Sequence, residues 1–423
     1  MIKNKILKIL KKNLKPAMGC TEPVAIAVAC ATARKNIGGN VLGVDVTLSN
    51  AFYKNAFSAK IPNTGRYGIE LAISLGIIDG NPDKELEFFN DITESEINTA
   101  QKMIDSNIVK FSSIETDLSV FIKVKLETTE GNCLVELTGT HTNISYIEVN
   151  GKVLLNSRNY SEKEKDDFEE FDFKEYLKAI IELEEKELTF FDEGINLNQK
   201  ISDYGIKNNC GIGLGAGYKK ILEKNIMCNN LVTLVRMGVA AASDARMGGA
   251  PLSVMSSCGS GNQGITTFIP IMVIASNLER SRVELYRALA ISNFVNAFAK
   301  NYLDKLAPIC GAAITAGVGT AAATVYLLGG DIKQMIGAMN GMIANFSGIV
   351  CDGAKESCSY KVSSACGEAV NLALLAVNDV YISKDQGILG KRVEDSFQNV
   401  AVLSNEGMKN VNDVMIKILK LKK

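Results

Sequence analysis

Apolar and polar residues follow a helical pattern in the N-terminal part of the chain. Lysines and apolar residues interleave at helical spacing in Met1–Lys12, which predicts a surface helix that Pro16 ends. Thr21-Glu22-Pro23 predicts the start of a second helix, because it combines a capping residue, an acid in the first turn and an early proline. Gly38-Gly39 ends that helix.

Further along, the two-residue alternation of strands replaces this pattern. Turn-forming residues separate five such segments: Val41–Ser49, Asp117–Glu127, Asn132–Thr140, Thr142–Val149 and Lys152–Leu155. Asn150-Gly151, between the last two, favours a hairpin turn. Charge then concentrates in Ser161–Lys186, which we interpret as a solvated helical linker.

From about Ser202 onward the strand signals vanish and Ala/Gly-rich helical segments follow. We therefore predict an α+β protein, with a mixed α/β domain over residues 1–200 and an all-helical domain over residues 201–423. Met247–Ser276 and Leu306–Gly330 are uncharged, but they are rich in small residues and broken by prolines. They fit buried, closely packed helices better than membrane spans.

Composition narrows the function classes. A net charge of −1 gives no basic surface for nucleic acid or for an anionic membrane. The N-terminus lacks the apolar core and cleavage site of a signal peptide, so we expect a cytoplasmic protein. Ten cysteines are then free thiols rather than disulfides, and we interpret five of them as inert apolar residues: Cys30, Cys133, Cys210, Cys228 and Cys366.

Three further cysteines, Cys310, Cys351 and Cys358, lie among small residues. If their thiolates converge, they are one ligand short of the four that a plain 4Fe-4S cluster takes, which leaves one iron open to a substrate. On one continuous helix, Cys351 and Cys358 would lie roughly 10 Å apart along the axis. Asp352-Gly353 breaks such a helix, so we predict a loop around Cys351 and a helix start near Cys358.

Two single residues are candidates for catalysis. Cys20 lies at a predicted helix start, where the helix dipole favours a thiolate, although a structural cysteine fits the same position. His141, the only histidine, titrates near neutrality and is a candidate acid or base, with a structural role as the alternative.

A Gly/Ser-rich stretch supplies candidate anion-binding groups. Arg246 can pair with a carboxylate, and Ser256–Gly264 carries bare backbone and small polar side chains, including Ser260, Asn262 and Gln263. The stretch is not a P-loop, because the Lys-Ser/Thr end is absent. The alternative is a glycine-rich helix connection with a surface arginine.

Together these segments resemble the L-cysteine desulfidase family, relatives of the iron–sulfur L-serine dehydratases. The resemblance runs from Pro16 to Met408 and is most specific in four stretches: Gly19-Cys20-Thr21-Glu22-Pro23, Arg246-Met247-Gly248-Gly249-Ala250-Pro251, Gly259-Ser260-Gly261-Asn262-Gln263-Gly264, and Cys351-Asp352-Gly353-Ala354-Lys355 with Cys358. Cys258 departs from the family's pattern, in which we expect a small polar residue, and it is a further candidate ligand.

The resemblance implies an oxygen-sensitive 4Fe-4S cluster on Cys310, Cys351 and Cys358, and elimination chemistry at Cys20. L-Cysteine would bind with its carboxylate on Arg246 and the Ser260–Asn262 loop. Cys20 would take the α-proton as a thiolate, or else hold the fourth iron at rest. Loss of sulfide then leads to pyruvate and ammonia, without pyridoxal phosphate.

Three alternatives stay open. The same machinery could act on L-serine; the chain could be a non-catalytic cluster protein that senses oxygen or amino acids; or its cysteines could bind no metal. We further expect a homodimer that acts on a small amino acid, with neither nucleic acid nor membrane as partner.

Overall fold

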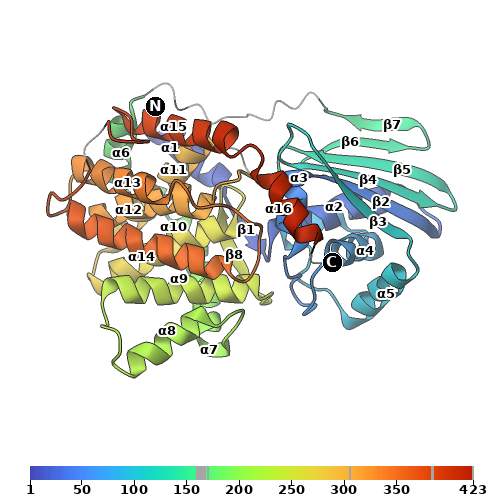
Figure 1. Ribbon diagram of the computed structural model, residues 1–423, viewed down its shortest axis with the longest axis horizontal. Helices are drawn as coiled ribbons and strands as arrows, with labels where there is room; N and C mark the ends of the chain where they lie inside the picture. Colours follow the sequence, from blue (N-terminus) through green and yellow to red (C-terminus); the bar gives the residue numbers. More distant parts are fainter. Residues whose placement is uncertain (159–167, 169–170, 304–305, 383–384, 422–423) are drawn as a thin grey trace.

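The computed structural model describes residues 1–158, 168, 171–303, 306–382 and 385–421. Two parts lie side by side (Figure 1). The sheet body comprises residues 14–156 and 411–420, and the helical body comprises residues 1–13, 173–300 and 311–407. Each body has its own hydrophobic core.

The sheet body is built on six strands in the order β3-β2-β4-β5-β6-β7. Their bounds are β2 (Val41–Ser49), β3 (Val109–Ile114), β4 (Phe121–Thr128), β5 (Gly131–Thr138), β6 (Ile144–Val149) and β7 (Lys152–Asn156). β2 and β3 pair parallel, and all other neighbours pair antiparallel. The parallel pair requires a crossover, which several helices supply.

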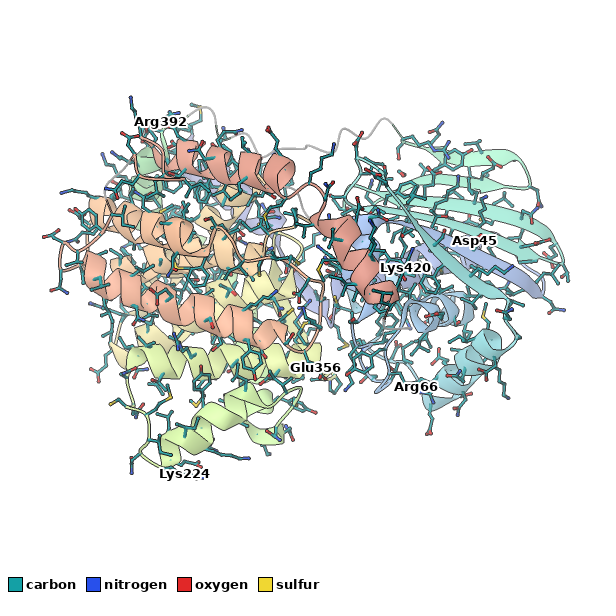
Figure 2. The ribbon with its side chains drawn as sticks, viewed as in Figure 1. Asp45, Arg66, Lys224, Glu356, Arg392 and Lys420 are labelled. Carbon is teal, nitrogen blue, oxygen red and sulfur yellow. The ribbon has the colours of Figure 1, made fainter. Side chains whose placement is uncertain are left out.

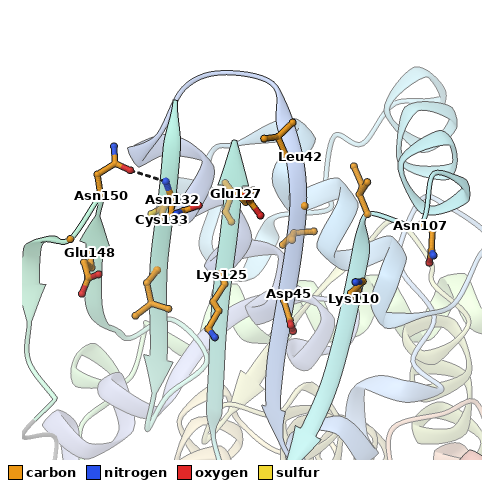
Figure 3. Close-up of a pocket in the computed structure, with 16 residues that line it drawn as sticks. Leu42, Asp45, Asn107, Lys110, Lys125, Glu127, Asn132, Cys133, Glu148 and Asn150 are labelled. Atoms are coloured by element: carbon orange, nitrogen blue, oxygen red, sulfur yellow. Dashed lines mark hydrogen bonds between the residues drawn. The ribbon is translucent and has the colours of Figure 1, made fainter. Parts of the chain in front are cut away.

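Helices cover one face of this sheet, and the other face is open. The helices are α2 (Thr21–Asn36), α3 (Asn50–Phe57), α4 (Ile69–Asp79), η1 (Pro82–Glu87), α5 (Glu94–Asp105) and α16 (Val411–Lys420). α2 is buried over every residue from Thr21 to Ala33, as expected for a helix that is apolar on all sides. On the open face, Asp45, Lys110 and Lys125 project outward (Figure 3).

The helical body contains the remaining helices. They are α1 (Ile2–Asn13), α6 (Phe173–Ile181), η2 (Glu185–Glu187), α7 (Phe191–Asn208), α8 (Leu214–Glu223), α9 (Leu231–Met247), α10 (Gly261–Asn277), α11 (Arg282–Lys300), η3 (Ala312–Ala316), α12 (Gly317–Leu327), α13 (Ile332–Phe346), α14 (Cys358–Ala376), α15 (Val393–Val402) and η4 (Leu403–Gly407). Small residues let these helices approach closely: a Cβ added at Gly319 would lie 2.2 Å from the Ser292 carbonyl oxygen. No helix in the described part of the chain is both long and apolar enough to cross a membrane.

A short ribbon ties the N-terminus to the helical body. β1 (Leu14–Met18) pairs antiparallel with β8 (Ser253–Ser257). Cys20 follows one strand and Ser260 follows the other, so the ribbon brings two distant segments of the sequence together. The prediction that residues 201–423 are all helical is wrong at β8, because a five-residue strand inside a Gly/Ser-rich stretch leaves too little alternation to detect.

The strands that the sequence predicts are present in the large sheet. All five predicted strands are confirmed, as β2, β4, β5, β6 and β7, and the α+β class is confirmed; β3 was not predicted. The first helix ends at Asn13, and Pro16 lies in β1, where an edge strand tolerates proline.

The predicted linker Ser161–Lys186 is described only in part. Residues 159–167 and 169–170 of the predicted linker lie outside the described residues, and α6 buries Phe173 and Tyr176. The helical core also contains Ile6 and Leu10 from the first 200 residues. The division of the chain at residue 200 therefore stays a prediction about folding units.

Candidate functional site

A small cavity lies where the two bodies meet. It has a volume of about 120 Å³. All nine site residues that the sequence singled out line it: Cys20, His141, Arg246, Ser260, Asn262, Gln263, Cys310, Cys351 and Cys358. Cys258 lines it as well. The structure therefore brings together residues that are up to 338 positions apart, while their individual roles stay predictions.

Backbone hydrogen bonds hold two of the cysteines next to each other. The Cys310 N–H donates to the Ile349 carbonyl at 2.8 Å, and the Cys351 N–H donates to the Pro308 carbonyl at 2.7 Å. Cys358 begins α14 after a turn at Gly353, which has a φ of 98°. A Cβ at Gly353 would lie 2.4 Å from the Lys54 carbonyl oxygen, so only glycine fits the turn against the sheet body.

The loop that carries Cys351 is clamped from several sides. Lys361 donates from Nζ to the Val350 carbonyl at 2.7 Å and also to Asp352. Burial raises the pKa of Asp352, but Lys355 and Lys361 outweigh burial and lower it to about 2. Glu356, which accepts a hydrogen bond from Tyr67 at 3.1 Å, lies where the loop meets the sheet body (Figure 2). These contacts confirm the predicted loop and the helix start at Cys358.

The donor set fits a cationic iron–sulfur cluster. Burial, and after it the nearby Cys351 and Cys358, raise the pKa of Cys310 to about 12. Three thiolates at this point would repel one another unless a positive group lay between them. Among the described residues, no three His, Cys, Asp or Glu side chains are close enough together to hold a single metal ion. A cluster suits wider spacing, because each cysteine binds a different iron.

Cys20 lies at the N-cap of α2, but burial and a neighbouring acid outweigh the helix dipole. Its Sγ donates to Oε2 of Glu22 at 2.8 Å. Burial and the Glu22 charge raise the pKa of Cys20 well above its ordinary value. The helix dipole alone therefore does not make Cys20 a thiolate, and its role as a thiolate base stays a prediction.

Glu22 is the site residue that sequence reasoning missed. It is 6% exposed and lines the cavity. Asn55 donates to its Oε1 at 3.0 Å, and Nε2 of His141 lies 3.9 Å from the same oxygen. Burial raises the pKa of Glu22, but His141, Cys20 and Asn55 together lower it to about 2. In the sequence Glu22 has the position of an ordinary acid in the first turn of a helix. Only its burial distinguishes it from such a surface acid.

Three residues that line the cavity have buried polar atoms without partners among the residues described. Nε of Arg246, Oε1 of Gln263 and Nε2 of His141 have no hydrogen-bond partner within the described part of the chain. Such atoms destabilise a protein unless a ligand or water satisfies them. Arg246 is held from the other side, since its Nη1 donates to Oδ1 of Asn262 at 2.9 Å. The planar guanidinium group of Arg246 can bind a carboxylate through hydrogen bonds.

A tight turn forms part of the cavity wall. Ser257 and Ser260 exchange backbone hydrogen bonds at 3.1 and 3.0 Å, with Cys258 and Gly259 both at positive φ between them. Ser260 caps α10, so the first turn of that helix begins beside Arg246. Bare N–H groups at a helix start favour an anion.

Comparisons with known proteins show the family of the chain. Residues 83–417 match the family model of the serine dehydratase alpha chain. A UPF0597 protein of Clostridium botulinum is 38% identical over 420 residues, which cover 99% of this chain and 97% of the relative. One of Clostridioides difficile is 35% identical, covering 98% of each chain, and one of Clostridium perfringens is 36% identical, covering 99% and 98%. The protein therefore belongs to the serine dehydratase alpha chain family of iron–sulfur serine dehydratase-like lyases.

Proposed function

We propose that the protein is an L-cysteine desulfidase that eliminates sulfide from L-cysteine, with pyruvate and ammonia as the other products. One observation carries the proposal: three cysteines, a buried arginine and a buried Cys20–Glu22 pair all line one cavity between the two bodies. Elimination from an α-amino acid requires this combination. One group binds the carboxylate, a base removes the α-proton, and a third group stabilises the leaving group.

Cys310, Cys351 and Cys358 would hold a 4Fe-4S cluster with one iron free of protein ligands. When bound, the cluster supplies Lewis acidity, which makes sulfide a better leaving group. The loop contacts of Asp352 and Gly353 keep the three cysteines turned toward the cavity.

The other residues bind the substrate and move its protons. Arg246 and the first turn of α10 at Ser260 receive the substrate carboxylate, and Gln263 and Asn262 complete this wall. Cys20 takes the α-proton as a thiolate after its own proton has left to solvent, while Glu22 stays ionised and orients the sulfur through the hydrogen bond between them. The ammonium group of the substrate promotes this ionisation, because positive charge beside Cys20 favours the thiolate. His141 then stabilises the Glu22 side chain from 3.9 Å.

L-Serine is the second candidate substrate, and the matched family description favours it. The same residues would act, with water in place of sulfide as the leaving group. The alternative role of Cys20 as the fourth iron ligand at rest is compatible with either substrate. We also propose that the protein is a homodimer in the cytoplasm. Light scattering on the anaerobic protein tests whether it is a dimer.

The deciding experiment is anaerobic. We expect purified protein to contain iron and acid-labile sulfide, and to release sulfide and pyruvate in equal amounts from L-cysteine. A large preference for L-serine would transfer the assignment to serine dehydratase. A cluster with four protein ligands whose spectrum does not respond to either amino acid would favour a sensor protein instead.

A further inference from the structure

A buried asparagine lies behind two walls of the candidate cavity. Asn296 belongs to the last turn of α11 and its side chain is 0% exposed. It is not among the described residues that line the cavity. Its amide instead forms hydrogen bonds to the two segments that carry Cys258 and Cys310, in keeping with the contacts that α11 makes with β8 and with η3.

The nitrogen of this amide holds the turn that precedes α10. Nδ2 of Asn296 donates to Oγ of Ser257 at 2.9 Å and to Sγ of Cys258 at 3.5 Å. Cys258 has a φ of 51°, a left-handed conformation that is costly for a residue with a side chain. The Cys258 N–H also donates to the Asn13 carbonyl at 2.9 Å. The amide and this backbone bond together fix the turn in its unfavourable conformation.

The oxygen of the same amide faces the segment that follows Cys310. Oγ1 of Thr315 lies 2.7 Å from Oδ1 of Asn296 and 2.7 Å from the Gly311 carbonyl oxygen. A hydroxyl has a single proton, which Thr315 shares between these two acceptors. Thr315 belongs to η3, a π-helical turn of a kind that occurs frequently at functional sites. Asn296 therefore reaches the cysteine segment through one side chain.

The two cavity walls are thus joined by one shared amide. Ser257 and Thr315 are both 0% exposed, so bulk solvent is not at hand to replace a lost amide. The walls also touch directly, since a Cβ added at Gly311 would lie 2.9 Å from Nε2 of Gln263. Segments in such close contact have little freedom, and the amide behind them sets how far apart they lie.

A second buried asparagine of α11 has different partners. Asn293, about one turn earlier, is 2% exposed. Its Nδ2 donates to the Leu289 carbonyl at 2.9 Å, and its Oδ1 accepts from Oγ1 of Thr267 at 2.9 Å. These bonds tie α11 to its own backbone and to the second turn of α10. Asn293 therefore matches Asn296 in helix, burial and chemistry, and serves as its control.

We propose that Asn296 is a positioning residue that sets the spacing between the carboxylate-binding turn and the cysteine segment. This inference rests on the proposed function, in which the substrate is bound at one wall and loses its side-chain heteroatom at the other. A displacement of about 1 Å between the two walls can lower the rate by about 100-fold. Arg246 would still bind the carboxylate, so the loss of Asn296 acts on kcat rather than on KM.

The kinetic test compares Asn296→Ala with Asn293→Ala. Each variant deletes a buried amide from α11, so Tm falls in both. We expect kcat for L-cysteine to fall by about 10- to 100-fold in Asn296→Ala, while KM stays within about threefold of wild type. Asn293→Ala should keep kcat within about threefold of wild type. Equal losses of kcat in the two variants would show that Asn296 only stabilises its helix, and would overturn the proposal.

A second measurement needs neither turnover nor the cluster. Cys258 is partly exposed, so its alkylation by iodoacetamide in protein freed of iron can be followed by mass spectrometry. Thr315→Val acts on the opposite side of the amide from Cys258, and we expect it to raise the alkylation rate about threefold or more, as does Asn296→Ala. The control Thr324→Val deletes an equally buried hydroxyl that donates to the Thr320 carbonyl at 2.7 Å, and should leave the rate unchanged.

The double variant Asn296→Ala/Thr315→Val shows whether the amide transmits the effect. It should react at the same rate as Asn296→Ala, because the connection to Cys258 is already lost.

The two measurements separate the inference from the proposed function. If the protein turns over neither amino acid, the proposed function fails, while the alkylation rates still decide whether Asn296 couples the two walls. Equal rates at Cys258 in wild type, Thr315→Val and Thr324→Val would overturn the inference and leave the proposed function intact.

Discussion

At the scale of single residues, burial sets the chemistry of the site. The same Cys20 would be a thiolate at an exposed helix start, but here it donates a hydrogen bond to a buried carboxylate. Glu22 keeps its charge only because His141, Cys20 and Asn55 compensate for its burial. Cys20 and Glu22 therefore form a hydrogen-bonded pair, and positive charge that enters the cavity favours ionisation of Cys20.

The first prediction concerns this pair. Cys20→Ala and Glu22→Gln each lower the turnover of L-cysteine by about 100- to 10,000-fold, the range for loss of a positioned acid or base, and each retains its iron. Cys30→Ala, in the same helix but outside the cavity, is the control. Activity and iron are measured on the same anaerobic samples. An active Cys20→Ala protein would show that another group removes the α-proton.

The second prediction concerns the cluster ligands. Cys310→Ala, Cys351→Ala and Cys358→Ala each abolish retention of iron and acid-labile sulfide, because two thiolates cannot hold the cluster that three hold. Cys366→Ala is the matched control: Cys366 is fully buried in α14, the helix that Cys358 begins, but does not line the cavity. Retention of iron by any of the three ligand variants would contradict the assignment of that cysteine.

At the scale of secondary-structure elements, close contacts aim the polar groups. α9 ends beside the start of α10, and Arg246 fills the space above Gly261. A Cβ at Gly261 would lie 2.2 Å from Nε of Arg246, and one at Gly264 would lie 1.8 Å from the Met255 carbonyl oxygen. The glycines therefore serve packing between elements rather than flexibility of a loop.

A third prediction follows from the contact at Gly261. Gly261→Ala displaces the guanidinium and raises KM for L-cysteine by about tenfold, the loss of roughly one hydrogen bond to a charged group, while iron content is unchanged. Gly217→Ala in α8 is the control, because nothing lies within 4 Å of its added Cβ. Steady-state kinetics measure the effect, and an unchanged KM would mean that Arg246 does not bind the carboxylate.

The fourth prediction concerns the packing of α8 against α9. Oδ2 of Asp244 accepts a hydrogen bond from the Gly215 N–H at 2.9 Å, and burial raises the pKa of Asp244 above its ordinary value. A raised carboxyl pKa stabilises the fold at pH values below the unfolded-state pKa, and this stabilisation is lost as pH rises through the folded-state value. The Tm of Asp244→Asn should therefore rise relative to wild type as pH increases from about 4 to about 7. Exposed Asp203→Asn should show no such trend.

At the scale of the whole molecule, the site belongs to neither body alone. Cys20, Glu22 and His141 come from the sheet body, whereas Arg246 and Cys358 come from the helical body. The β1–β8 ribbon and the contacts of Glu356 join the two bodies around the cavity. A small shift of one body relative to the other would separate the proposed base from the proposed cluster.

The fifth prediction tests the division of the chain at residue 200. The segment 201–423 expressed alone should not fold or bind iron, because the helical core also uses α1, α6 and α7, and because β8 pairs with β1. Co-expression with the segment 1–200 should restore soluble protein and iron content. Circular dichroism and iron analysis of segment 201–423 measure the outcome, and a folded, iron-binding fragment would confirm an independent domain.

Much of the local structure was predictable because it depends on neighbouring residues. Alternation of apolar and polar positions identified five of the six strands of the large sheet, and Asp352-Gly353 correctly indicated a break before Cys358. β3 was missed although Val109-Lys110-Phe111 alternates, because it has only six residues, and β8 was missed because its five residues are mostly serine and show no apolar alternation. Glu22 was missed for a different reason: an acid in a first helical turn is ordinary until the fold buries it.

The sequence by itself determined the α+β class, the helix and strand periodicities and the chemical identity of nine residues that line the cavity. Only the tertiary structure decided that these residues meet at one cavity and that burial beside Glu22 raises the pKa of Cys20. The physical reason is that periodicity and capping act over a few residues, whereas burial, charge coupling and cavity shape arise from residues hundreds of positions apart.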